Sequence, residues 1–151
     1  MEQSVKGDNL SEDFLSIIKK EFELEGVDLR LYSPLSLAFL GDCVYDLVIR
    51  SLLVVPGKRK VESLHKEKSR MVNATAQAQY IKKLKDVLND EEMEIFKTGR
   101  NTKVHSKAKN AGIGDYHNAT GYEALLGYLY LKGENERIVE LVKLSMEDKQ
   151  R

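Results

Sequence analysis

The 151-residue chain has one cysteine, Cys43, only two prolines, and no tryptophan. A single thiol cannot form an internal disulfide, which excludes a disulfide-stapled scaffold and fits a reducing compartment. No run approaches the roughly 18 consecutive apolar residues that a membrane-spanning helix needs. The first ten residues also lack the apolar segment of a secretory signal. We therefore expect a cytoplasmic protein with no membrane partner.

Net charge of one sign is also missing, because 24 Lys and Arg residues balance 24 Asp and Glu residues. The distribution is nevertheless uneven. Residues 57–70 carry six basic and two acidic side chains, and residues 97–110 carry five basic and no acidic ones, whereas residues 1–28 carry eight acids and three lysines. One basic run is usually a solvated face, but two in a neutral chain favour a localised site for a polyanion.

Apolar residues recur at helical spacing and strand patterns are nearly absent, which predicts a single all-α domain over residues 1–151. Ser11 is the predicted N-cap of the first helix. Ser33 and Pro34 form a predicted N-cap and first helical residue. The segment that follows, to about Val54, is apolar nearly all round, so we expect it in the middle of a bundle.

The rest of the chain is also predominantly helical in pattern. Helices are predicted over residues 61–88 (one kinked helix or two), 91–98 after Asp90, 117–131 and 134–146. The segment 99–115 has three glycines and few large apolar residues, which predicts a long and therefore functional loop. We expect residues 1–10 and 147–151 to be flexible.

Three acids lie on the two most apolar predicted helices. Asp42 and Asp46 are four residues apart and so share one helix face, and Glu123 lies among apolar residues of the second helix. Burying such carboxylates without a partner is costly. Oxygen ligands alone favour Mg²⁺, with Mn²⁺ as a substitute. The alternative is that the three acids lie at helix surfaces and pair with Lys or Arg.

The other reactive side chains give weaker signals. Cys43 has no nearby base in the sequence, which predicts a core position rather than a nucleophile. His65, His105 and His117 lack the spacing of metal ligands, so we expect them at the surface or at helix caps.

Two motifs carry a family resemblance. Residues 37–46, LAFLGDCVYD, resemble the signature helix of the ribonuclease III family, whose aromatic-Leu-Gly-Asp core holds the catalytic aspartate, here Asp42. Residues 122–130, YEALLGYLY, are similar to the second acidic motif of the family, which places Glu123 at its glutamate. The resemblance covers about residues 33–133.

Three departures from full-length bacterial members narrow the resemblance. Ala38 and Thr120 stand where those enzymes have a glutamate and an aspartate, and we expect no double-stranded-RNA-binding domain. The Mini-III subfamily of Gram-positive bacteria shows the same departures. Residues 99–103 and 109–110 are similar to its loop.

The resemblance implies the all-α ribonuclease III endonuclease fold, a homodimer, and Mg²⁺-dependent cleavage of double-stranded RNA that matures the ends of precursor 23S ribosomal RNA. Asp42 and Glu123 carry over as the catalytic, metal-binding pair, and Asp46 takes an accessory metal role. The missing domain implies weak RNA binding that a ribosomal protein on the substrate assists. The side chains expected to contact RNA are Lys58, Arg59, Lys60, Arg100, Asn101, Lys103, Lys107, Lys109 and Asn110.

Two alternatives stay open at this point. Ala38 and Thr120 suit an inactive module of the same fold that binds structured RNA without cutting it. A helical interaction protein with ion-paired acids would show neither metal dependence nor affinity for duplex RNA.

Overall fold

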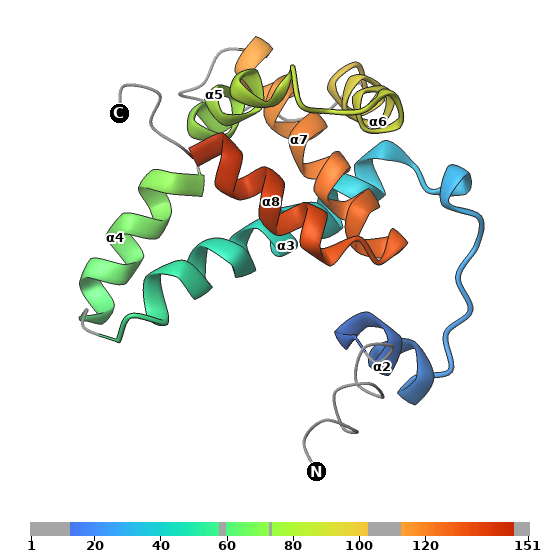
Figure 1. Ribbon diagram of the computed structural model, residues 1–151, viewed down its shortest axis with the longest axis horizontal. Helices are drawn as coiled ribbons and strands as arrows, with labels where there is room; N and C mark the ends of the chain where they lie inside the picture. Colours follow the sequence, from blue (N-terminus) through green and yellow to red (C-terminus); the bar gives the residue numbers. More distant parts are fainter. Residues whose placement is uncertain (1–12, 58–59, 73, 103–112, 147–151) are drawn as a thin grey trace.

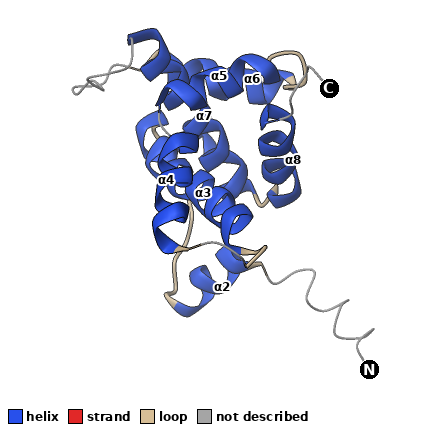
Figure 2. Cartoon of the chain, turned by 90° about the vertical axis from the view of Figure 1, so that its left-hand side faces the viewer, coloured by secondary structure: helices blue, strands red, loops and turns tan. Residues whose placement is uncertain are grey.

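A computed structural model describes residues 13–57, 60–72, 74–102 and 113–146, and every regular element in these ranges is helical (Figure 2). The elements are α2 (Phe14–Glu21), the 3-10 helix η1 (Leu29–Leu31), α3 (Pro34–Val54), α4 (Val61–Val72), α5 (Ala74–Leu84), α6 (Asp90–Arg100), α7 (Ile113–Lys132) and α8 (Asn135–Met146). The predicted all-α fold class is confirmed. Among the described helices, none is long and apolar enough to cross a membrane.

Helix α7 forms the centre of the fold, and α3, α5, α6 and α8 all pack against it (Figure 1). The α7 residue Tyr122 is fully buried and meets Tyr45 of α3 edge to face, with ring centroids 5.4 Å apart. The Tyr45 hydroxyl donates to the Met71 carbonyl at 3.1 Å and so ties the end of α4 to α3. Burial raises the pKa of both tyrosines. These contacts fix the angle at which α3 and α7 cross.

Helix α3 begins and ends where the sequence predicts. The Ser33 hydroxyl accepts a hydrogen bond from the Ser36 amide at 3.0 Å, and Pro34 is the first helical residue. The helix ends at Val54, and Gly57 then adopts a left-handed φ of 80° that favours glycine.

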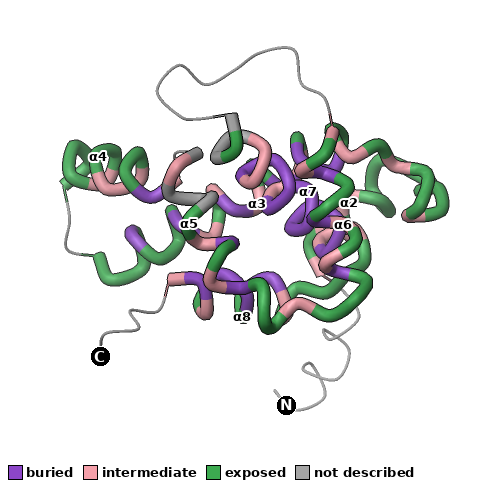
Figure 3. Tube along the Cα trace, turned by 90° about the horizontal axis from the view of Figure 1, so that it is seen from above, coloured by how far each residue is buried: buried purple, intermediate pink, exposed green. Residues whose placement is uncertain are grey.

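The predicted burial of α3 is wrong for one of its faces. Tyr45 and Ile49 face α7 and are fully buried, but Phe39 on the outer face is 84% exposed, and Leu47 is 60% exposed. Figure 3 shows buried and exposed positions alternating along the helix. Cys43 belongs to the exposed face and not to the core. Helix α3 is apolar on all sides, yet the described part of the chain covers only its inner face.

Several other boundaries differ from the prediction. Asp13 caps α2, because its carboxylate accepts from the Ser16 amide at 2.8 Å, and the predicted cap Ser11 lies outside the described residues. The segment 61–88 is two helices, α4 and α5. Helix α6 begins after Asn89, which forms a capping box with Glu92, and it extends to Arg100. The predicted loop over residues 99–115 is shorter at both ends, because α6 extends to Arg100 and α7 begins at Ile113.

A buried ion pair joins α6 to α8. The Glu92 side chain is almost wholly buried, and Arg137 donates to both of its carboxylate oxygens at 2.8 Å. Arg137 also donates to the Val87 carbonyl at 2.8 Å. The guanidinium lowers the pKa of Glu92. The pair therefore ties α6 to α8.

Candidate active site

The two predicted catalytic acids lie on α3 and α7 where the backbones of these helices cross. A Cβ atom at Gly41 would overlap the carbonyl oxygen of Glu123, and one at Gly127 would overlap the carbonyl oxygen of Leu37. Only glycine leaves room for backbones this close. Asp42 follows Gly41 directly, so the same contact brings Asp42 and Glu123 to one place in the fold.

The two acids differ from expectation in their burial. Asp42 is exposed and Glu123 is half-buried, while the neighbours of Glu123, Tyr122 and Ala124, are fully buried. Both carboxylates thus lie at the edge of the α3–α7 contact, and neither is sealed in the core. Asp42 could therefore take a ligand from solvent without the desolvation cost that full burial would impose.

Asp46, the third predicted acid, has cationic partners. Its Oδ2 lies 2.7 Å from Arg50 Nε, and its Oδ1 lies 3.5 Å from Lys68 Nζ. Among the described residues, no three His, Cys, Asp or Glu side chains gather closely enough to hold a metal. Asp46 therefore fits the alternative in which an acid at a helix surface pairs with Lys or Arg. Its accessory role in metal binding stays a prediction.

The two positions that lack an acid are both buried. Ala38 lies one turn before Asp42, and Thr120 lies three residues before Glu123. Both pack inside the helix bundle, where an acid would carry a large desolvation cost unless a cation faced it. The predicted catalytic pair is therefore preceded on each helix by a small or neutral buried residue, Ala38 or Thr120.

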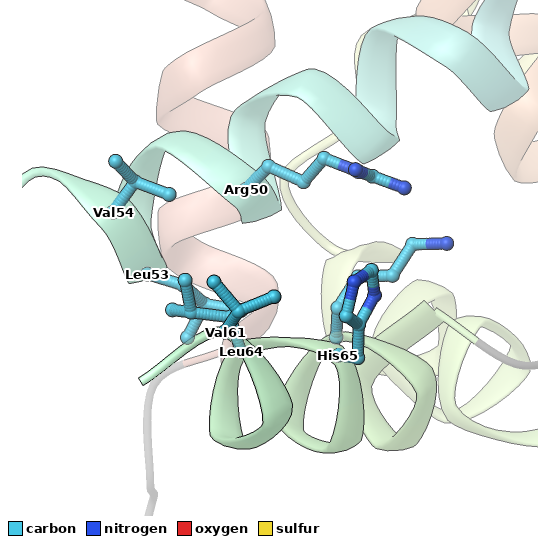
Figure 4. A pocket seen from close by; sticks show the side chains of 7 residues that line it. Arg50, Leu53, Val54, Val61, Leu64 and His65 are labelled. Atoms are coloured by element: carbon cyan, nitrogen blue, oxygen red, sulfur yellow. The ribbon is translucent and has the colours of Figure 1, made fainter. Parts of the chain in front are cut away.

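A cavity of about 210 Å³ lies between α3 and α4 and is rimmed by basic side chains. Figure 4 shows Arg50 reaching from α3 and His65 rising from α4. Lys68 lines the same cavity. The remaining lining residues are apolar: Leu53, Val54, Val61 and Leu64. Arg50 lies outside both basic runs, and only its spacing of four residues from Asp46 marks it in the sequence.

Three of the predicted RNA contacts are described. Lys60 is exposed just before α4, Arg100 is half-buried in the last turn of α6, and Asn101 is exposed as its C-cap. His117 Nδ1 lies 2.8 Å from the Arg100 carbonyl, which confirms a capping role for this histidine. The other predicted contacts lie outside the described residues: Lys58, Arg59, Lys103, Lys107, Lys109 and Asn110.

Comparison with known proteins decides the family. Residues 35–134 match the Ribonuclease III domain. The chain belongs to the ribonuclease III family. This ribonuclease III domain is 47% identical over 118 residues to the Mini-ribonuclease 3 of Clostridium tetani, a match that covers 78% of each chain. It is 49% identical over 116 residues to that of Brevibacillus brevis, covering 77% of this chain and 87% of the relative.

A solved structure supports the same assignment. The crystal structure of a protein from Fusobacterium nucleatum superposes on this ribonuclease III domain with a TM-score of 0.75 at 31% identity, covering 82% of this chain and all of that one. The predicted subfamily is confirmed, and the chain is an endoribonuclease. Enzymes of this family act on double-stranded RNA and are generally dependent on a divalent metal.

Proposed function

We propose that the chain is a Mg²⁺-dependent endoribonuclease that cuts paired RNA at the ends of precursor 23S ribosomal RNA in the cytoplasm, with Asp42 and Glu123 as its catalytic pair. The observation that carries this proposal is the glycine contact between α3 and α7, which puts the backbone beside Asp42 against that of Glu123, with Asp42 exposed and Glu123 half-buried. In phosphodiester hydrolysis the nucleophile is water, so the chain need not supply a nucleophilic side chain. Its contribution is the pair of carboxylates.

The donor set fits a hard divalent cation. Asp42 and Glu123 offer carboxylate oxygens, which Mg²⁺ prefers and Mn²⁺ also accepts, and the exposure of Asp42 suits an ion that keeps several waters. Such an ion, when bound, supplies Lewis-acid stabilisation of the phosphate and a water of lowered pKa. The chain's two carboxylates would hold such an ion. Without a cation they would repel an RNA phosphate.

The basic side chains support a duplex RNA substrate. A-form RNA is recognised through its shape, phosphates and 2′-hydroxyls, for which lysine, arginine and asparagine are suited donors. Lys60 is exposed at the start of α4, and Arg100 and Asn101 end α6 beside Glu123. We expect salt-sensitive binding through these side chains, which a ribosomal protein on the precursor strengthens.

The exposed face of α3 supports a homodimer. Phe39, Cys43 and Leu47 are four residues apart and form an apolar stripe open to solvent. An apolar stripe of this kind is typical of an interaction surface. A second copy that covers it would place two active sites on one RNA duplex.

Cleavage of a labelled hairpin that mimics the paired rRNA ends tests the proposed function. We expect wild type to cut it with Mg²⁺ and not without, and Asp42→Asn to bind the hairpin without cutting it. Asp86→Asn, which changes an exposed acid away from the crossing, is the matched control and should cut normally. Retardation of the RNA by wild type with no cutting under any divalent ion would instead support the inactive RNA-binding module that Ala38 and Thr120 suggest.

A further inference from the structure

A side chain of α7 is hydrogen-bonded to the C-terminal end of α6. The last four carbonyls of a helix have no intrahelical partner. In α6 the carbonyls of Lys97, Thr98 and Gly99 accept from residues 101 and 102, at 2.7–3.2 Å. The Arg100 carbonyl instead faces Nδ1 of His117, from α7, at 2.8 Å. Because a carbonyl only accepts, Nδ1 carries the proton and donates.

Backbone contacts place this helix end beside the active site. A Cβ at Gly99 would lie 2.8 Å from the Cβ of Ala124, and a Cβ at Gly121 would lie 2.6 Å from the Phe96 carbonyl oxygen. Ala124 and Gly121 flank Glu123 on α7. The last turn of α6 therefore packs against the turn of α7 that carries a catalytic acid.

The two side chains at this helix end are held together. The Arg100 guanidinium lies over the Phe96 ring, 5.7 Å from its centroid, and its Nε donates to the Asn101 side chain at 3.3 Å. A pair that is ordered before RNA arrives loses less conformational freedom on binding. The direction in which the pair projects follows from the path of the backbone at Arg100, whose carbonyl is the group that His117 contacts.

We propose that His117 is a positioning residue for RNA binding: its Nδ1–H holds the Arg100 carbonyl so that Arg100 and Asn101 grip the RNA backbone at a set distance from Glu123. This inference rests on the proposed function, in which Arg100 and Asn101 contact RNA. The imidazole donates from Nδ1 in its neutral form and in its protonated form, so protonation does not break the contact.

Two substitutions separate the hydrogen bond from the bulk of the side chain. His117→Asn keeps an N–H at the position of Nδ1, whereas His117→Gln moves the N–H outward to the position of Nε2. With the hairpin and no divalent ion, we expect His117→Gln to raise Kd roughly fivefold to tenfold, the size of one lost hydrogen-bonded contact. We expect His117→Asn to stay within roughly twofold of wild type. With Mg²⁺ the loss should appear in KM and not in kcat.

A double-mutant cycle distinguishes positioning from a general loss of stability. Arg100→Ala should weaken binding in wild type and lower the salt slope by about one, but add little in His117→Gln, because the same contact is already lost. Lys60→Ala, at the start of α4, is the control and should add fully to His117→Gln. Thermal unfolding of each variant shows whether it is folded.

The outcomes separate the inference from the proposed function. If wild type neither binds nor cuts the hairpin, the proposed function fails, and the inference fails with it. If wild type cuts but His117→Asn and His117→Gln change Kd by the same factor, only the positioning role is overturned. The same holds if the effects of His117→Gln and Arg100→Ala on binding are additive.

Discussion

The two faces of α3 have similar side chains and opposite surroundings. On the inner face, Gly41 and Tyr45 are packed so closely against α7 that not even a methyl group could be added at Gly41. On the outer face, Phe39 and Leu47 are as apolar but open to solvent. Asp42 lies between the two faces.

The difference shows how one helix serves two purposes. The inner face fixes the position of the backbone, and with it the distance between Asp42 and α7. The outer face contributes little to the fold of a single chain, and the proposed homodimer would account for its apolar character. Changes on the inner face should therefore affect stability and the site together, and changes on the outer face should affect association alone.

Gly41→Ala should give the largest effect, because the added methyl group meets backbone atoms of Glu123 that cannot turn away. Overpacking of a core costs about 1–3 kcal/mol and more where backbone must move, so we expect a loss of at least about 3 kcal/mol. Urea unfolding measures it. Gly114→Ala is the matched control, since no described residue lies within 4 Å of a Cβ there, and it should be neutral or stabilising. Equal effects of the two substitutions would contradict the close packing of the inner face.

Arg137→Ala should destabilise the protein by about 3 kcal/mol, because it leaves the buried Glu92 carboxylate without its guanidinium partner. The matched control is Lys132→Ala, which breaks the more exposed pair with Glu91 and should cost much less, because solvent screens that pair. Similar losses from both would show that the α6–α8 connection is no stronger than a surface pair. Urea unfolding at neutral pH makes the comparison.

Acid should weaken the same connection. The pKa of Glu92 is lower in the folded protein than its ordinary value of 4.5, so the unfolded chain binds the proton more readily than the folded one. The stabilisation is therefore fully present above pH 4.5 and is lost as the pH falls below it through the folded pKa. We expect the stability difference between wild type and Glu92→Gln to shrink over that range. A constant difference would refute the linkage.

Phe39→Ser should have the smallest effect on the stability of one chain and a clear effect on association. With 84% of Phe39 exposed, we expect the free energy of unfolding of the monomer to change by under about 0.5 kcal/mol. Sedimentation should show dimer dissociation at roughly tenfold higher protein concentration. Val139→Ser, at an exposed position on α8, is the control and should leave association unchanged. A wild-type chain that is monomeric at all concentrations would contradict the role given to the outer face.

Local signals in the sequence predicted much of this fold. Ser33 and Pro34 marked the start of α3 correctly, because an N-cap acts through hydrogen bonds within four residues. The outer face of α3 was expected in the core and is exposed instead. A pattern of apolar residues does not show whether the chain itself covers them. Lys68 as a partner of Asp46 could not be foreseen, since it comes from another helix.

The site was only partly accessible to the same reasoning. The motifs singled out Asp42 and Glu123. The burial expected of both acids differs from the structure, because burial depends on how α3 and α7 cross, and the sequence does not show that geometry. The contact of His117 with Arg100 spans 17 residues of chain, and no spacing rule connects them.

Titration with Mn²⁺ tests most directly whether the crossing makes one site from two acids. Bound Mn²⁺ is counted by electron paramagnetic resonance for wild type, Asp42→Asn, Glu123→Gln, the double variant and the control Asp86→Asn. The account predicts that each site variant weakens the same binding event and that the double variant weakens it little further, because the two carboxylates share one ion. Mn²⁺ binding by the double variant with the affinity of wild type would contradict it.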